Sequence, residues 1–317
     1  MITRATWLRQ SAAGIASLGL GASARAADAE ALDLIRVATT PNDAGACVYY
    51  AEDLGLFKRA GLRVEITAQN NGGIIGSSVA SGAIDIAQAS TPSIASAHDH
   101  GIPFTIITAG SEYISSEPTN QLLVTKSSPI HTAADLTGKV VAVAGLLNSA
   151  HIATASWIDK HGGNSAGVKF IEMSYAEMLP AVLAGRIDAA SISEPFLSAA
   201  LPQVRSIGNP YDAIASDFIL GVWFARIDYI KEHPSIVRRF NDVMIATAKW
   251  ANAHKAETAV LLQRDLKTTV APGMLRVRYS ESTSAALLQP FIDAAAKYKA
   301  IKATFPAGDV IATLPSA

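Results

Sequence analysis

The sequence contains little cysteine and almost no net charge. Cys47 is the only cysteine among the 317 residues, which excludes an internal disulfide framework and a metal site built from several cysteines. Lysine and arginine together number 26 and aspartate and glutamate 27, which gives a net charge of −1. This balance provides no electrostatic reason to bind nucleic acid or a membrane surface. We therefore expect no nucleic-acid partner.

Motifs that mark common catalytic and metal sites are also missing. The chain has no Gly-x-Ser-x-Gly motif, no Ser-His-Asp order, no P-loop and no pair of carboxylates at a defensible spacing. His98 and His100 lie two residues apart on a predicted helix end, so their side chains point in different directions and do not form a metal pair. The sequence therefore lacks these signatures of catalysis, and we expect no cofactor and no metal site.

The apolar run near the N-terminus is too short to span a bilayer. Arg4 and Arg9 precede the run 11–24, which is followed by the small-x-small pattern Ala24-Arg25-Ala26. These features predict an export signal over residues 1–26, cleaved near Ala26; a membrane anchor or a frayed terminus are the alternatives. No twin arginine and no lipid-attachment cysteine accompany it. The mature chain is expected in the periplasm.

One pattern occurs twice and organises the rest of the chain. The segments 79–90 (VASGAIDIAQAS) and 183–196 (LAGRIDAASISEPF) each contain a glycine, then a hydrophobic residue and an aspartate, then a short apolar run. The glycine is suited to the positive φ that ends a helix, and the apolar run is typical of a buried strand. Each copy therefore predicts a helix, a tight turn and a strand, and two copies predict two similar lobes.

The order of the other segments predicts an α/β fold. Apolar or alternating runs indicate strands at 35–39, 62–67, 103–109, 121–125, 140–144, 168–173 and 218–224, and helical periodicity indicates helices between them and over 234–251 and 287–298. The helices after the last of these strands are expected to pack onto the first lobe. We predict lobe 1 from 27–115 and 219–317, lobe 2 from 116–218, and a two-segment hinge near 112–121 and 207–218.

With these elements laid out, the chain resembles the solute-binding components of bacterial ABC importers. The resemblance is to the group that takes nitrate, sulfonates, taurine and pyrimidine precursors of thiamine. It is carried by an ordered set of short motifs: Gly55-Leu56-Phe57-Lys58, Gly61-Leu62-Arg63-Val64-Glu65, Gly72-Gly73, Gly82-Ala83-Ile84-Asp85, Leu136-Thr137-Gly138-Lys139, Gly185-Arg186-Ile187-Asp188-Ala189-Ala190, Glu194-Pro195 and His233-Pro234.

This resemblance implies the type II fold of periplasmic binding proteins, with a ligand cleft between two lobes and no catalysis. It implies a monomer that delivers a small organic molecule to an ABC permease: an organic acid, a sulfonate, or an aromatic or heteroaromatic compound such as a thiamine pyrimidine precursor. The alternative is an enzyme of pyrimidine or quinone metabolism on the same fold. The chain has no cysteine-rich iron motif, and it carries a predicted export signal; both observations favour the binding protein.

Candidate ligand-binding residues follow the predicted strands, because open α/β sheets bind ligands at the carboxyl ends of their strands. Asn148 and Ser149 open a helix whose free N–H groups and dipole suit a carboxylate, sulfonate or phosphate, although Ser149 could simply cap that helix. Glu194 could accept a hydrogen bond from a ligand amino group, bind the opposite lobe or cap the next helix. The full set is Asn42, Asp43, Gly72, Gly73, Ser90 and Thr91 from lobe 1, and Asn148, Ser149, His151, Tyr175 and Glu194 from lobe 2.

Overall fold

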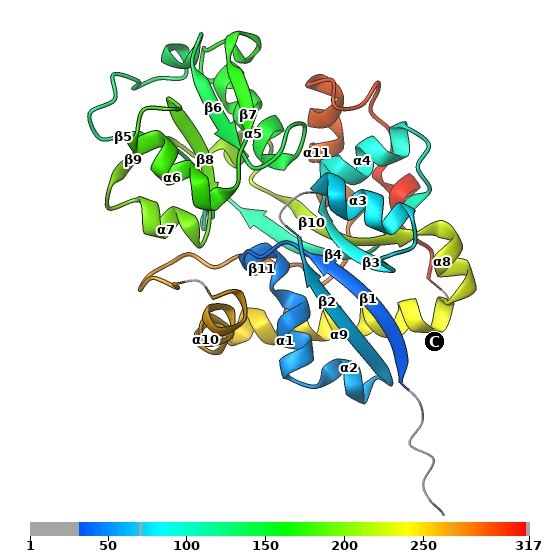
Figure 1. The fold of residues 1–317 in the computed structure, drawn as a ribbon. Coiled ribbons are helices and arrows are strands. Elements are labelled where there is room, and N and C mark those ends of the chain that lie inside the picture. The colour runs from blue at the N-terminus through cyan, green and yellow to red at the C-terminus, as the bar shows by residue number, and fades with distance from the viewer. Residues whose placement is uncertain (1–31, 70–71, 268, 315–317) are drawn as a thin grey trace, which may run out of the picture. The chain divides into compact units, whose positions relative to one another are not determined.

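Two β-sheets form the frame of the protein in the computed structural model, which describes residues 32–69, 72–267 and 269–314 (Figure 1). The first sheet has the strand order β2 (Leu62–Ala68), β1 (Asp33–Thr39), β3 (Ile86–Ser90), β10 (Asp217–Arg226), β4 (Phe104–Ile114) and β11 (Arg278–Tyr279). The second has the order β7 (Lys169–Glu172), β6 (Val140–Val143), β8 (Ala189–Ser193), β5 (Asn120–Thr125) and β9 (Val204–Gly208). The α/β prediction is confirmed.

The two sheets share one pairing scheme. In the first, β1 pairs in parallel with β2 and β3, and β10 pairs antiparallel with β3 and β4. In the second, β6 pairs in parallel with β7 and β8, and β5 pairs antiparallel with β8 and β9. The strand that pairs antiparallel with the three parallel strands is β10 in the first sheet and β5 in the second. The chain enters each of these two strands directly after it crosses from the other sheet.

The repeated sequence pattern has the structure that it predicts. Helix α3 (Gly72–Ala80) precedes β3, helix α6 (Tyr175–Leu183) precedes β8, and the turn glycines Gly82 and Gly185 have φ values of 76° and 66°. The aspartate of each copy ties its strand to the neighbouring one. The Arg36 N–H donates to Asp85 and the Val140 N–H to Asp188, each at 2.8 Å.

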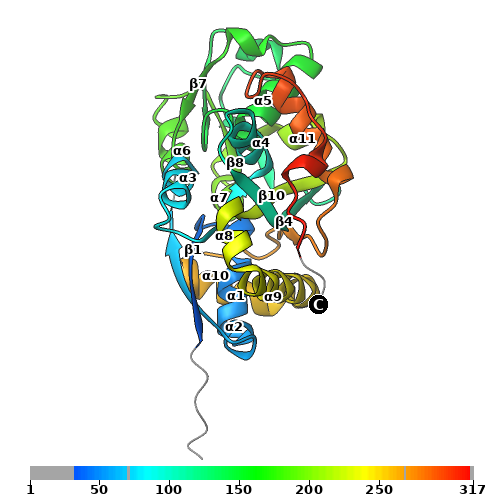
Figure 2. The ribbon, with the colours of Figure 1, turned by 90° about the vertical axis from the view of Figure 1, so that its right-hand side faces the viewer.

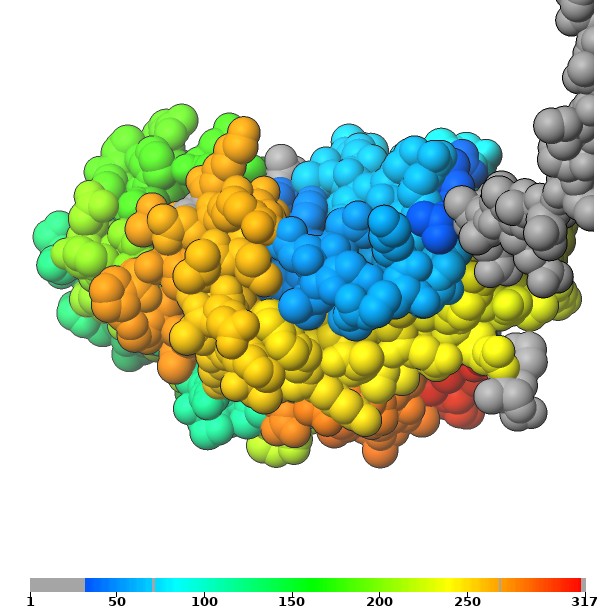
Figure 3. Space-filling model, turned by 90° about the horizontal axis from the view of Figure 1, so that it is seen from below, coloured from blue at the N-terminus to red at the C-terminus, as the bar shows by residue number. Residues whose placement is uncertain are grey.

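Helices cover both faces of the first sheet. Figures 1 and 2 show α4 (Thr91–Asp99) and α11 (Ala285–Lys297) on one side and α1 (Cys47–Asp53) and α9 (Pro234–Ala253) on the other. The apolar face of α9 is buried and packs against α1 and β4, so this helix returns to the first sheet as expected. In Figure 3, α9 (yellow) lies beside α1 and α2 (blue) on the lower surface.

Five further helices and five 3-10 helices complete the described fold. They are α2 (Leu56–Arg59), α5 (Ser149–Lys160), α7 (Phe196–Ala200), α8 (Ile227–Glu232) and α10 (Lys255–Leu266), with five 3-10 helices, Asp43–Gly45, Ala134–Leu136, Ser165–Gly167, Pro210–Ala213 and Ala307–Val310. The short strands β9 and β11 and the helix α10 were not predicted from the sequence. β9 lacks a regular alternation of buried and exposed residues, which explains why periodicity does not reveal it.

Two connections cross between the sheets. One joins β4 to β5 through residues 115–119, and the other leads from the second sheet to β10 through residues 214–216. They lie side by side, because the Ser115 N–H donates to the Ser216 carbonyl at 2.8 Å. Within the ranges that the structure describes, no helix has both the length and the apolar character needed to cross a bilayer. The predicted export signal lies outside these ranges.

Candidate functional site

A cavity of about 350 Å³ lies between the two sheets. Residues that follow β1, β3, β6 and β8 line it, so the carboxyl ends of strands from both sheets meet there, as is typical of ligand sites in open α/β sheets. Nine of the predicted site residues line this cavity: Asn42, Asp43, Gly72, Gly73, Ser90, Asn148, Ser149, Tyr175 and Glu194.

The structure does not place Thr91 and His151 in the cavity lining. Thr91 is buried, and its hydroxyl donates to the Ile219 carbonyl at 2.8 Å, so it joins α4 to β10. His151 lies in the first turn of α5, with its ring 4.3 Å from that of Phe170. Both side chains therefore contact other parts of the protein and lie outside the cavity lining.

The N-terminus of α5 presents unpaired donors to the cavity. Asn148 accepts from the His151 N–H through its side chain and from the Ile152 N–H through its carbonyl, at 3.1 and 3.0 Å. The first four N–H groups of a helix have no partner within it, so those of Ser149 and Ala150 remain. The buried Ser149 hydroxyl also lacks a partner among the described residues. Ser149 and Ala150 both line the cavity, at the end of α5 where the helix dipole favours negative charge.

His151 holds the loop that leads into this helix. Its Nδ1 accepts from the Leu147 N–H at 2.8 Å, and Leu147 has a φ of 60°, a conformation that an L-residue rarely adopts without support. Burial lowers the pKa of His151 from 6.5 to about 4, so the imidazole is neutral and can accept this hydrogen bond. His151 therefore positions the corner that carries Asn148 and Ser149.

We expect a His151→Asn variant to lose part of the acid sensitivity of the wild type. The folded-state pKa of His151 lies below its unfolded value, so its contribution to stability is complete above about pH 6.5 and is lost as the pH falls toward about 4. Asparagine does not titrate there and retains an acceptor for Leu147. Urea unfolding of both proteins at several pH values in this window measures the effect, and a stability difference that does not change with pH would contradict it.

Glu194 has an engaged carboxylate. One oxygen accepts from the Ser198 N–H at 3.0 Å and the other from the Ser198 hydroxyl at 2.7 Å, so Glu194 caps the start of α7 while lining the cavity. Burial raises the pKa of Glu194, an effect that the bonds from Ser198 only partly offset. Its carboxylate has lone pairs left for a ligand donor, but its position is fixed by the local cap.

Aromatic side chains form part of the cavity wall. Tyr175 stacks on Phe196, with ring centroids 5.8 Å apart and an angle of 22° between the rings, and its hydroxyl donates to Ser193 at 3.2 Å. The buried Tyr211 also lines the cavity. Of these three residues, the sequence identified only Tyr175. No motif around Phe196 or Tyr211 distinguishes a residue that lines a cavity from one that packs in the core.

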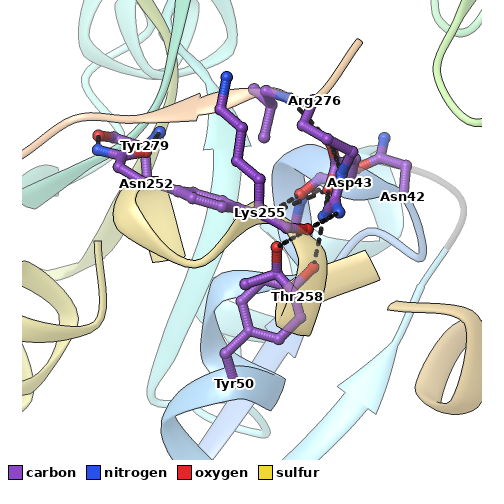
Figure 4. Close-up of polar contacts among 10 residues, drawn as sticks. Asn42, Asp43, Tyr50, Asn252, Lys255, Thr258, Arg276 and Tyr279 are labelled. Carbon is purple, nitrogen blue, oxygen red and sulfur yellow. Dashed lines mark hydrogen bonds and ion pairs between the residues drawn. The ribbon is translucent and has the colours of Figure 1, made fainter. Parts of the chain in front are cut away.

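Asp43 lines the cavity but is committed to a buried ion pair (Figure 4). Arg276 donates to its two carboxylate oxygens at 2.9 and 2.6 Å, and the Val277 N–H adds a bond of 2.9 Å. Arg276 also donates to the Tyr50 hydroxyl. Burial lowers the pKa of Arg276, yet the hydrogen bonds and charge of Asp43 more than reverse this and leave it above its ordinary value. Arg276 is 233 residues away in the sequence, and no pattern marks it.

The described lining contains carboxylates but no lysine, arginine or histidine. Besides Asp43, which is paired with Arg276, the acidic residues of the lining are Glu172 and Glu194. Thr40, Gln88 and Ser111 add uncharged polar groups from the first sheet. Gln88 could have been found from the sequence, because its long amide side chain lies inside the short strand Ile86–Ser90, between two alanines. The described residues hold no cluster of three or more side chains suited to a metal ion.

Solved structures with the same fold include several periplasmic binding proteins. The aliphatic sulphonate binding protein SsuA from Escherichia coli superimposes with a TM-score of 0.71 at 18% identity, covering 90% of this chain and 94% of that one. The nitrate-binding protein NrtA from Synechocystis PCC 6803 gives 0.72 at 13% identity, covering 88% and 85%. The desulfurization enzyme DSZB gives 0.67 at 12%, covering 88% and 96%. The fold is the type II fold of periplasmic binding proteins.

The family is shown by a sequence model. The model described as "NMT1/THI5 like" matches residues 42–258, which is more than half of the chain. The protein therefore belongs to this family, as the ordered motifs predicted. No curated protein matches the sequence.

Proposed function

We propose that this protein is a periplasmic solute-binding protein that delivers a small organic molecule to an ABC permease. The observation that carries the proposal is the cavity between the two sheets, which Ser149 and Ala150 line at the N-terminus of α5 and where the buried Ser149 hydroxyl has no partner among the described residues. Unpaired buried donors cost free energy unless a ligand or water accepts from them. Sulfonate- and nitrate-binding proteins with the same fold support the assignment.

For the ligand we propose an organic acid or a sulfonate, with an aromatic or heteroaromatic compound such as a thiamine pyrimidine precursor as the second choice. The donors at α5 suit a carboxylate or sulfonate. Tyr175 and Phe196 offer apolar surface to an organic body, which nitrate lacks.

We further propose that the two sheets belong to lobes that close on the ligand. Lobe 1 comprises 27–115 and 219–317, and lobe 2 comprises 116–218. The two crossing connections are short and hydrogen-bonded to each other, which suits a hinge that absorbs backbone rotation.

A thermal-shift screen with alkanesulfonates, small organic acids, aminopyrimidines and nitrate tests the ligand class. A ligand present at about a hundred times its dissociation constant adds about 2.7 kcal/mol, which corresponds to a rise in Tm of roughly 5 to 10 °C for a domain of this size. We expect such a rise with at least one organic probe and none with nitrate, and a smaller radius of gyration in solution scattering with the same probe.

Two outcomes would count against this function. A shift with nitrate alone would contradict an organic ligand, and an unchanged scattering curve at saturating probe would contradict lobe closure. The screen needs no knowledge of the permease and uses the purified mature chain.

The alternative, an enzyme on the same fold, has support only from the fold that DSZB shares. Cys47 is buried at 2% exposure, does not line the cavity, and has a pKa raised by burial, so its thiol stays protonated and is not a suitable nucleophile. Sustained conversion of a bound probe by the purified protein would overturn the binding-only function.

A further inference from the structure

The cavity contains a niche in the first sheet at Gly221. This glycine lies in β10, opposite Ser90 of β3 and Ser111 of β4, and the register between β10 and β4 shifts on both sides of it. A bulge of this kind bends the strand and changes where neighbouring side chains point. A Cβ atom at Gly221 would lie 2.7 Å from the Ser111 hydroxyl oxygen and 2.7 Å from Gln88 Nε2. Both polar atoms therefore face the side of Gly221 that carries no side chain.

The two polar atoms are not bonded to each other. Ser111 is fully buried, and its hydroxyl has no hydrogen-bond partner among the described residues. Gln88 is 6% exposed, and its Oε1 accepts from the Thr40 hydroxyl at 3.0 Å, which turns Nε2 toward the niche. Both residues line the cavity. A buried hydroxyl without a hydrogen-bond partner is uncommon in folded proteins, and a bound ligand or water would supply that partner.

We propose that the niche formed by Gly221, Ser111 and Gln88 binds an uncharged oxygen group of the ligand, a hydroxyl or a carbonyl. This inference rests on the proposed function and adds a specificity-determining site in the first sheet, across the cavity from the donors of α5. An oxygen atom within hydrogen-bond distance of both polar atoms bridges the gap between them.

The chemistry of the lining selects this group. Ser111 can donate or accept, and Gln88 presents a donor through Nε2, so an acceptor oxygen satisfies both. A charged carboxylate fits less well, because the described lining offers no cationic residue to neutralise it. Only glycine leaves the niche open, because any side chain at position 221 begins with a carbon atom too close to both polar atoms.

Matched pairs of probes test the niche by isothermal titration calorimetry. One series is straight-chain alkanesulfonates of two to six carbons, and the other is the same sulfonates with a terminal hydroxyl. Carboxylate pairs and aminopyrimidines with and without a hydroxymethyl group extend the set. We expect the wild type to bind the hydroxylated member of at least one pair about tenfold more tightly than its partner.

Three variants locate that preference. Gly221→Ala fills the niche, and Ser111→Ala removes one of its polar atoms without adding volume; both are expected to bring the ratio within a pair to about one while the unhydroxylated probe still binds. Gly76→Ala is the matched control, since a Cβ atom there meets nothing within 4 Å and Gly76 does not line the cavity. If Gly221→Ala does not fold, Ser111→Ala carries the test.

Each result decides between the niche and the proposed function. Binding of probes without any preference for a hydroxyl, or a preference that survives in both Gly221→Ala and Ser111→Ala, would overturn the niche and leave the proposed function standing. The first outcome would mean that the niche holds water only. Failure of the wild type to bind any member of any pair would overturn both.

Discussion

Replacing Asp43 by asparagine is expected to destabilise the protein by roughly 3 to 5 kcal/mol, because it leaves the buried Arg276 without its counter-charge. Arg276 is 7% exposed and Asp43 is 2% exposed, so water cannot solvate the unpaired guanidinium. The bonds from Val277 and Tyr279 to Asp43 would weaken as well. For a domain of this size the loss corresponds to a fall in Tm of roughly 6 to 20 °C.

Urea unfolding and calorimetry of the apo protein measure this effect. The matched control is Glu65→Gln, which removes the carboxylate of an ion pair with Arg63 in which both side chains are 60% exposed. An exposed pair of this kind contributes about 0 to 1 kcal/mol, so the control should unfold almost as the wild type does. Equal stability of the Asp43→Asn and Glu65→Gln variants would show that the buried pair is not the support that its geometry indicates.

Replacing Ser149 by proline is expected to weaken binding of an organic acid or sulfonate by about a hundredfold or more. The change removes the Ser149 N–H and its hydroxyl together, and hydrogen bonds to a charged group contribute about 1.5 to 3 kcal/mol each. Proline is compatible with the first position of a helix, and Asn148 already has the extended backbone, with φ −87° and ψ −176°, that a residue before proline favours. The apo protein should therefore fold normally.

Two further variants separate binding from folding. Ser149→Ala removes only the hydroxyl and should weaken binding about tenfold. Ala285→Pro places proline at the first position of α11, after the extended Ser284 and outside the cavity lining, and should leave the affinity unchanged. Calorimetric titration with the best probe of the thermal-shift screen gives the affinities. If the Ser149→Pro variant binds the probe as tightly as the wild type, the anionic group of the ligand does not bind at the N-terminus of α5.

Local patterns in the sequence determined the frame and most of the site edge. The paired glycine and aspartate motifs predicted two equivalent helix-turn-strand units, because a left-handed turn and a buried strand depend on residues close together in the chain. The carboxyl ends of the predicted strands then identified Ser90, Asn148 and Ser149 as neighbours of one cavity, which the structure shows them to be. The edge of each sheet at which the cavity lies follows from these local rules, whereas the order of the strands within each sheet does not.

Pairings between distant segments were decided by the tertiary structure alone. The sequence offered Asp43 as a ligand contact, and the fold supplies Arg276, far away in the chain, as its partner. The sequence did not decide whether Glu194 contacts a ligand or caps a helix. The structure shows that both of its carboxylate oxygens accept hydrogen bonds from Ser198. The niche at Gly221 depends on three strands whose register no local pattern encodes. These long-range contacts decide whether a polar side chain forms its hydrogen bonds within the protein or remains available to a ligand. The reason is that a buried polar group is stable only with the partners that the fold brings within hydrogen-bond distance.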